Sequence, residues 1–360
     1  MDVDTTLSDL TTNYVVDAEM QTTPCGALCS SCNILHKVNI LTQRVEELTI
    51  SKKKLSEQLA SQNNVNLMPE KQLIFYTCIS KARYLALLAA IVVCLPQAQK
   101  IHHSAQLLMV LMKLRLALPY QELAYRFNVH RHTVSSTFKI WIKPLAILCS
   151  HLVKFPSPSV AQTWLTKTER RKFPSLRCII DCTEVKVSRP HNLDTQQVVW
   201  SNYKQTSTLK YLVCVNNAGA VAFISKAYGG RISDKSITLK SGFLDLVNKR
   251  DKVLANRGHL LHDEFALRNV ELITHTFTKN KQQLSAIETT KSRRISSTRI
   301  IVERAIGYMK NWRILTGTVP YHLCPMYDDI LVVVSGLANV ALLIAKKGFA
   351  ESASTEESPS

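Results

Sequence analysis

Two carboxylates in the sequence stand in apolar surroundings where an unpaired charge would be costly. Asp181 follows the residues Cys178, Ile179 and Ile180 in a segment with the composition of a strand, and Glu303 lies among Ile, Val and Ala residues of a segment with helical periodicity. Buried carboxylates need a partner or a metal ion, and oxygen ligands of this kind suit Mg²⁺. The simpler alternatives are a surface Asp on an edge strand and a solvated helix Glu.

Asn256 is the third position of interest, because it directly follows the short apolar run Val253 to Ala255. The residue just past such a strand often takes part in chemistry in α/β enzymes. Three acids at these points would hold two Mg²⁺ ions roughly 4 Å apart. A carboxamide oxygen can touch Mg²⁺ but brings no charge to offset the repulsion between two dications. Asp181, Asn256 and Glu303 are therefore the candidate catalytic set.

The elements that would position these residues begin near residue 160, where strand and helix patterns alternate. Strands are predicted over 176–188, 209–217, 220–230, 251–258 and 269–277, and helices over 233–248 and 296–315, with Ser233 as a possible cap. This order of elements is that of RNase H folds: three antiparallel strands, then a helix, a strand, a helix, a strand and a helix. The expected fold is an α/β, RNase H-like mixed sheet flanked by helices over 160–347, with a tail at 348–360.

An all-helical segment over 68–155 precedes this domain and contains a helix-turn-helix pattern. A helix is expected from Tyr120 to Phe127, then a turn at Asn128 and Val129, then a second helix from about His130. The alternative is a plain helical hairpin. The exposed face of the second helix would meet DNA through His130, Arg131, His132, Ser135 and Lys139.

A heptad pattern over 34–63 predicts a short coiled coil, after a polar tail at 1–33. Its apolar positions run from Ile34 to Leu59, with Lys52 in the one polar slot. This predicts a homodimer through residues 34–59, or otherwise a single amphipathic helix packed on the body.

The charge balance points to a polyanion partner, since 45 Lys and Arg against 27 Asp and Glu give a net charge of +18. The alternative is a basic protein without such a partner. Further basic residues, either lining a DNA groove or lying in a solvated loop, are Lys279, Lys281, Arg293 and Arg294. No membrane partner is expected, because the longest apolar runs fall short of the roughly 20 residues of a span.

The ten cysteines are scattered, several of them in apolar runs, which favours reduced thiols in the cytosol or nucleus. Cys25, Cys29, Cys32 and His36 have spacings that could serve one cramped zinc site. No second group of zinc-ligand spacings follows these residues. The alternative is that these cysteines precede the heptads by chance and bind no metal.

Several long motifs occur in one order along residues 70–345. They include "IIDCTEVKVSRPHNL", "WSNYKQTSTLKYLVCVNNAGAVAFISKAYGGRISDKS", "VLANRG" and "RIIVERAIG". This series resembles the PIF/Harbinger-type DDE transposases, in particular animal proteins that pair a Harbinger-like helix-turn-helix with a DDE superfamily endonuclease domain. Many of those carry an N-terminal THAP zinc finger, for which this sequence offers no room. The resemblance implies an RNase H-like core, Mg²⁺ or Mn²⁺ as cofactor, DNA as substrate and a separate DNA-binding helper protein. The basic runs "KKK" at 52–54 and "ERRK" at 169–172 are weak signals for nuclear import, and we expect a nuclear location.

Carried onto this chain, the resemblance assigns the family's first Asp to Asp181 and its Glu to Glu303. The second Asp, from a motif like "LADRG", falls on Asn256. Asp234 in "GGRISDKS" is the best candidate for a substitute metal ligand, ahead of Asp263. We expect a transposase-derived DNA-binding protein with a weakened or inactive nuclease. The alternatives are a domesticated non-enzymatic DNA-binding or chromatin factor and, last, a nuclease that tolerates the amide.

Overall fold

The structure is a computed structural model that describes residues 30–97, 101–256, 258, 259, 261–275 and 285–355. It divides into two compact units, residues 1–57 and 58–360. The described part of the first unit belongs to helix α1 (Ser30–Gln62), where the sequence predicts heptads. The apolar seam of α1 is open to solvent, with Val38 at 50% and Leu41 at 64% exposure. The expected tail at 1–33 lies outside the described residues as far as residue 29.

The second unit begins with helices that frame the predicted helix-turn-helix. These are α2 (Glu70–Thr77), α3 (Lys81–Val92), α4 (His103–Leu116), α5 (Tyr120–Phe127) and α6 (Arg131–Ser150). Asn128 ends α5 in the left-handed conformation, and the Val129 N–H donates to the carbonyl of Ala124 at 3.0 Å. Small Ala124 is buried at this corner together with Leu123 and Val134. The expected bounds of α5 and the start of α6 agree with the structure.

A mixed sheet forms the centre of the unit. Its strands are β1 (Leu176–Lys186), β2 (Trp200–Ser201), β3 (Thr206–Val215), β4 (Val221–Ile224), β5 (Tyr228–Gly229), β6 (Lys252–Ala255) and β7 (Glu271–Ile273). The order is β2-β3-β1-β6-β7, with β4 and β5 also paired to β3. β1 and β3 are antiparallel, whereas β1, β6 and β7 are parallel. The sheet is thus mixed and the fold is of the α/β class, as the sequence predicts.

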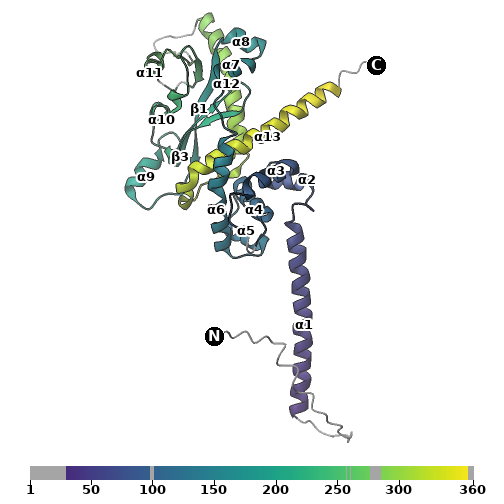
Figure 1. Ribbon diagram of the computed structural model, residues 1–360. Coiled ribbons are helices and arrows are strands. Elements are labelled where there is room, and N and C mark those ends of the chain that lie inside the picture. The colour runs from purple at the N-terminus through teal and green to yellow at the C-terminus, as the bar shows by residue number, and fades with distance from the viewer. Residues whose placement is uncertain (1–29, 98–100, 257, 260, 276–284, 356–360) are drawn as a thin grey trace. The chain divides into compact units, whose positions relative to one another are not determined.

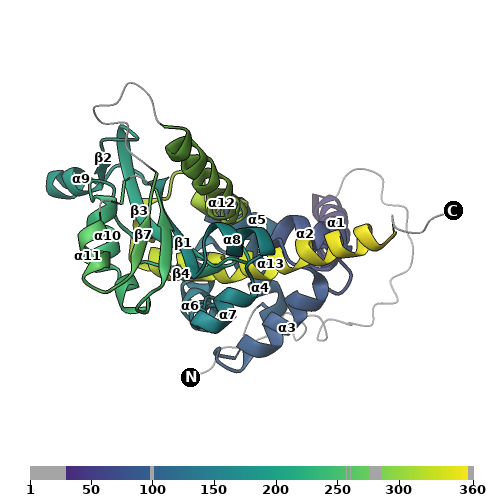
Figure 2. The same ribbon diagram turned by 90° about the horizontal axis from the view of Figure 1, so that it is seen from above.

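Helices cover both faces of the sheet (Figures 1 and 2). The helices of this part of the chain are α7 (Pro158–Thr163), α8 (Lys167–Lys172), α9 (Leu193–Val199), α10 (Asp234–Lys240), α11 (His262–Ala266), α12 (Ala286–Lys310) and α13 (Tyr327–Thr355). Ser233 caps α10 as predicted, since its hydroxyl accepts the Ser236 N–H at 3.1 Å. The sequence did not predict the short elements α7, α8, α9, α11 and β2. Helix α13 continues to Thr355, beyond the expected domain end at 347.

The alternation of β1 separates two apolar cores. Ile179 belongs to the core that contains Val302 of α12, whereas Ile180 belongs to the core that contains Ile237 of α10 and Phe265 of α11. Successive side chains of a strand point to opposite faces. Asp181 is therefore directed toward α12, and the next residue, Cys182, is directed toward α10.

The helical segment and the sheet share one core rather than forming separate bodies. Helix α6 packs along α13, where a Cβ on Gly336 would meet the Cys149 Cβ at 2.7 Å. The Asn339 side chain joins the two, donating to the carbonyls of Leu152 and Val221 at 2.9 and 2.8 Å. Residues 68–155 and 160–347, which we expected as two domains, thus lie in one compact unit.

By length and composition, the segment Tyr321–Ala341 would be able to cross a membrane, and so would α2 and α3 if they acted as one bent span. The first segment is 56% buried inside the protein. Its Ser335 hydroxyl and Asn339 amide form hydrogen bonds within the core. We interpret α13 as a core helix, as its sequence predicts.

Candidate active site

One guanidinium joins the two predicted acids. The terminal nitrogen Nη2 of Arg299 lies 3.4 Å from Asp181 Oδ2 and 3.6 Å from Glu303 Oε1. Arg299 and Glu303 are one turn apart on α12, and Asp181 reaches them from β1. Asp181 is largely buried, while the Glu303 side chain is 57% exposed. The two acids therefore lie on the same side of the sheet and converge on one cation.

Competing effects act on the Asp181 carboxyl. Burial raises the pKa of this carboxyl, and the nearby negative charge of Asp234 raises it further. Arg299 and the hydrogen bond that the Cys182 N–H donates at 2.9 Å lower the pKa. The net result is a raised pKa, which means that the surroundings do not fully compensate the ionised form. A divalent cation beside this carboxylate would favour the ionised form.

Asn256 follows the end of β6, beside Asp181. Ile180 of β1 pairs with Ala255, the last residue of the parallel strand β6. The next residue along the chain is Asp181 in β1 and Asn256 just past β6. The backbone carbonyl of Asn256 accepts a hydrogen bond from the His259 N–H at 3.1 Å, which closes a tight turn. The backbone of Asn256 therefore lies at the end of β6, where the sequence predicts the third residue of the set.

Asp234 lies on the opposite face from the Asp181–Glu303 pair. It is the first residue of α10, and the Lys210 Nζ lies 2.6 Å from its Oδ1. Lys210 also lies 3.7 Å from Glu184 Oε1. To assist Asp181, the Asp234 carboxylate would have to leave Lys210 and turn around the edge of β1. The predicted alternative Asp263 is exposed in the first turn of α11.

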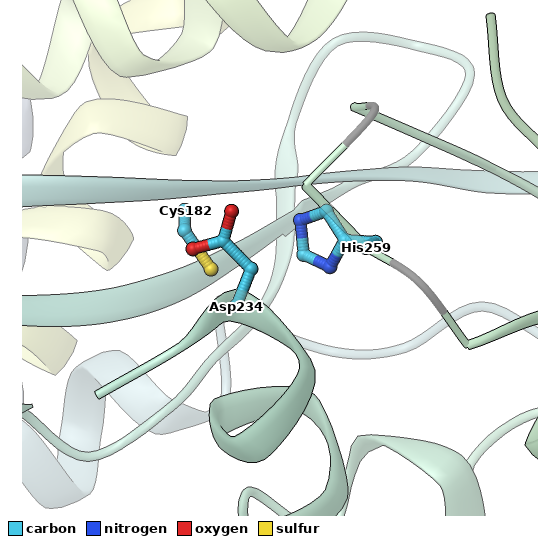
Figure 3. Close-up of side chains that lie close together, drawn as sticks. All are labelled: Cys182, Asp234 and His259. Carbon is cyan, nitrogen blue, oxygen red and sulfur yellow. The ribbon is translucent and has the colours of Figure 1, made fainter. Parts of the chain in front are cut away.

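Asp234 is close to two side chains that the sequence did not single out. The ligand atoms of Cys182, Asp234 and His259 all lie within 4.8 Å of one another, the one group of three such residues that converges in the described part of the chain (Figure 3). Burial lowers the pKa of His259 to about 4 and raises that of the Cys182 thiol. Cys182 was visible in the sequence as the neighbour of Asp181, but His259 had no motif of its own.

The predicted DNA-binding residues of the helix-turn-helix gather at the start of α6. His130, Arg131, His132 and Lys139 are exposed, and Ser135 is half-buried. His130 also caps the helix, since its Nδ1 accepts the His132 N–H at 3.2 Å. Its ring is thus partly committed to holding the helix end.

Arg131 borders a basic cavity of about 260 Å³ that also reaches the sheet-bearing part of the unit. Lys113 of α4, Arg313 and His322 contribute to its wall, and none of the described residues that line it is acidic. Burial lowers the pKa of Lys113 to about 8. Burial and the charges of Lys113, Arg131 and Lys139 lower the pKa of His322. The cavity thus carries positive charge that its lining does not balance.

A second group of basic residues lies along α12 and α8. Arg293 and Arg294 are exposed on α12, and Lys172 at the end of α8 lies 3.5 Å from the Ser297 hydroxyl. The predicted Lys279 and Lys281 lie outside the described residues. In the proposed zinc cluster, Cys25 and Cys29 also lie outside them, while Cys32 and His36 are one turn apart in α1.

Comparison with known families gives two matches. Residues 180–339 match the model of the DDE superfamily endonuclease, and residues 100–150 match the helix-turn-helix of DDE superfamily endonuclease. The first match contains Asp181, Asn256 and Glu303, and the second contains α4, α5 and α6. No curated protein matches the chain.

Proposed function

Because the chain carries a DDE superfamily endonuclease domain with its helix-turn-helix, we propose that it is a transposase-derived DNA-binding protein whose nuclease is weakened or inactive. The observation that carries this proposal is the convergence of Asp181 and Glu303 on Arg299, with an amide at the third position. We assign it to the PIF/Harbinger type on its sequence motifs. A nuclear location and a separate helper protein belong to the same proposal.

The strand order supports an RNase H-like reading of the domain. Five strands of the sheet lie in the order β4-β3-β1-β6-β7. The neighbours β4, β3 and β1 pair antiparallel, whereas β6 and β7 run parallel to β1. In an RNase H-like fold, the first strand lies in the centre of the sheet next to the fourth strand, and the last long helix crosses both strands. Strands β1 and β6 and helix α12 take these places here. Asp181 lies in β1, Asn256 directly follows β6, and Glu303 lies in α12, which supports this reading.

The donor set suits one divalent ion better than two. Asp181 and Glu303 would supply the charged oxygens for Mg²⁺ or Mn²⁺, and such ions activate a water or a 3′-hydroxyl and stabilise the leaving oxygen of a phosphodiester. Asn256 offers a neutral oxygen at best. Asp234 is the candidate substitute, and its effect on the pKa of Asp181 places its charge nearby. Arg299 positions both acids and competes with any ion for their charge.

A non-enzymatic DNA-binding or chromatin factor is the second candidate. The observation that favours it is again Arg299, whose guanidinium lies against both carboxylates and offsets part of their charge without a metal. Such a site can be retained for its contribution to stability while the chemistry is lost.

DNA is the proposed partner in both cases. The exposed start of α6, the basic cavity beside it and the arginines of α12 offer phosphate contacts, in line with the net charge of +18. Binding through such contacts weakens steeply as salt rises.

The test of the proposal is a metal-dependent nicking assay with the purified protein and its Asn256→Asp variant. A restored carboxylate returns the missing negative ligand, so we expect the variant to cut at least about 100-fold faster in Mg²⁺ or Mn²⁺. Equal and robust cutting by both proteins would contradict a weakened nuclease.

Two controls separate this effect from others. Asn256→Asp combined with Glu303→Gln should return cutting to the background, because the restored acid has lost its partner. Asn202→Asp, at an exposed amide away from the site, should leave cutting unchanged. If no variant cuts but all bind DNA, the non-enzymatic candidate is favoured.

A further inference from the structure

A thiol, a carboxylate and an imidazole converge on the face of β1 that is turned away from Asp181 and Glu303. Cys182 comes from β1, Asp234 from the first turn of α10 and His259 from the turn after β6 (Figure 3). His259 is wholly buried. These three residue types are the usual ligands of Zn²⁺ and related ions, which prefer nitrogen and sulfur donors to the all-oxygen set of Mg²⁺.

The hydrogen bonds around His259 determine which ring nitrogen carries its proton. The Thr238 hydroxyl lies 2.8 Å from the Asp234 carbonyl, to which it donates its single hydrogen. The same hydroxyl oxygen lies 3.2 Å from His259 Nδ1, so Nδ1 must be the donor in that contact. In the neutral ring Nε2 then carries a lone pair, and Nε2 is buried without a hydrogen-bond partner.

This buried lone pair is turned toward the Asp234 carboxylate, as Figure 3 shows. Two acceptors that face each other without a proton between them repel, and a cation between them would remove the repulsion. The Nδ1–H contact with Thr238 is also the type of outer hydrogen bond that orients a metal-binding histidine.

The backbone near His259 leaves room for close approach. A Cβ on Gly258 would lie 2.3 Å from Asp234 Oδ2, so glycine at this position allows the carboxylate to reach the turn. Donor atoms around a tetrahedral ion lie about 4 Å apart or less. Since the three ligand atoms already lie within 4.8 Å of one another, small side-chain shifts would suffice.

Lys210 is the competing cation at this site. Its Nζ lies 2.6 Å from Asp234 Oδ1, but it also lies 3.7 Å from Glu184 Oε1 and 3.4 Å from the Ile232 carbonyl. When an ion takes the Asp234 carboxylate, the ammonium keeps these two partners. The lysine therefore need not be expelled for the ion to bind.

We propose that Cys182, Asp234 and His259 form a binding site for one Zn²⁺-class ion, separate from the acids that face α12. Binding replaces the thiol S–H bond by a sulfur–metal bond and releases one proton to solvent. The thiolate and the carboxylate then neutralise the dication. The ion would fasten α10 and the turn after β6 to β1. With the ion bound, Asp234 would not be available as the substitute ligand beside Asp181. The site does not depend on whether the chain cuts DNA.

The test is a titration of the full-length, chelator-treated protein with Co²⁺, followed by competition with Zn²⁺. We expect a thiolate-to-cobalt charge-transfer band, tetrahedral visible bands and release of one proton per ion. Cys182→Ser should abolish the charge-transfer band, and His259→Phe should weaken binding at least about 100-fold. Phe fills the same buried space without a ligand nitrogen, and thermal unfolding without metal checks that each variant folds.

Other thiols are separated by matched variants. Cys29→Ser tests the amino-terminal cysteines and Cys94→Ser tests an exposed thiol; both should retain the charge-transfer band. Glu303→Gln should also retain it, which distinguishes this site from the nuclease acids. A band that persists in Cys182→Ser, or that is lost in Cys29→Ser, overturns the proposal, as does the absence of any band in the unaltered protein.

Discussion

Arg299 sets the electrostatics of the candidate active site, because a single nitrogen of its guanidinium lies against both Asp181 and Glu303. Burial raises the pKa of Asp181 by more than Arg299 lowers it, so the net shift is upward. In the proposed weakened site, the Asn256 amide would fit this reduced charge, since a third carboxylate would add repulsion without a second ion.

Lys113 gives a prediction about pH, because burial lowers its pKa from 10.5 to about 8. Between these values the unfolded chain holds the proton more tightly than the folded protein does, so stability rises with pH across this window. Relative to Lys113→Met, the unaltered protein should gain up to about 3 kcal/mol between pH 7 and about pH 10.5. Urea unfolding of both proteins at several pH values measures this. A difference in stability that stays constant with pH would show that Lys113 does not titrate as the structure indicates.

The sequence predicted individual acids better than it predicted their partners. Asp181 and Glu303 stood out because charge is rare in apolar runs, and the order of elements was enough to place them on one side of the sheet. Arg299 was one helical turn from Glu303, but its reach to Asp181 depends on how α12 crosses β1. His259 came into the second cluster through a turn whose geometry no local pattern specifies.

At the level of elements, the patterns with strong local causes were the most predictable. The bounds of α5, the corner at Asn128 and the Ser233 cap follow from short-range sterics and hydrogen bonds. The short pieces α7, α9 and β2 lack the length over which periodicity becomes visible. Their positions are set by packing on β1 and β3.

Helix α6 carries the prediction at this scale. Arg131, at its first turn, is exposed and borders the basic cavity. If it contacts a DNA phosphate, Arg131→Gln should weaken binding by a similar factor for all sequences and reduce the slope of log K against log salt by about 1. Fluorescence anisotropy across a salt series measures both. Arg44→Gln, which removes an exposed charge from α1, is the matched control. An unchanged slope for Arg131→Gln would place the phosphate contact elsewhere.

At the level of the whole molecule, the helical segment and the endonuclease domain share a core. Packing of α6 on α13 and the bonds of Asn339 join segments far apart in the sequence. The sequence predicted two domains because an all-helical pattern gives way to alternating strands and helices near residue 160. It contained no signal for the contact between α6 and α13. A consequence is that the basic cavity takes its wall from both segments, with Lys113 and Arg131 from one and Arg313 and His322 from the other.

The exposed seam of α1 carries the last prediction, which concerns the oligomeric state. Val38, Leu41, Val45 and Leu48 are each at least half exposed on a helix with little else to bury, and a lone helix in water is marginally stable. Pairing with a second copy through these heptads would bury them, at about 1.5–3 kcal/mol for each side chain fully buried. Light scattering should therefore give about twice the chain mass of 40.5 kDa.

Replacing Leu41 and Leu48 together by Glu places charges in the seam and should shift the protein to the mass of a single chain. The matched control replaces Gln43 and Ile50 by Glu, because these positions lie on the outer side of the same helix and should leave the dimer intact. If the unaltered protein already has the mass of one chain at micromolar concentration, α1 is a single amphipathic helix. If both double variants dissociate equally, general charge rather than the heptad seam governs association.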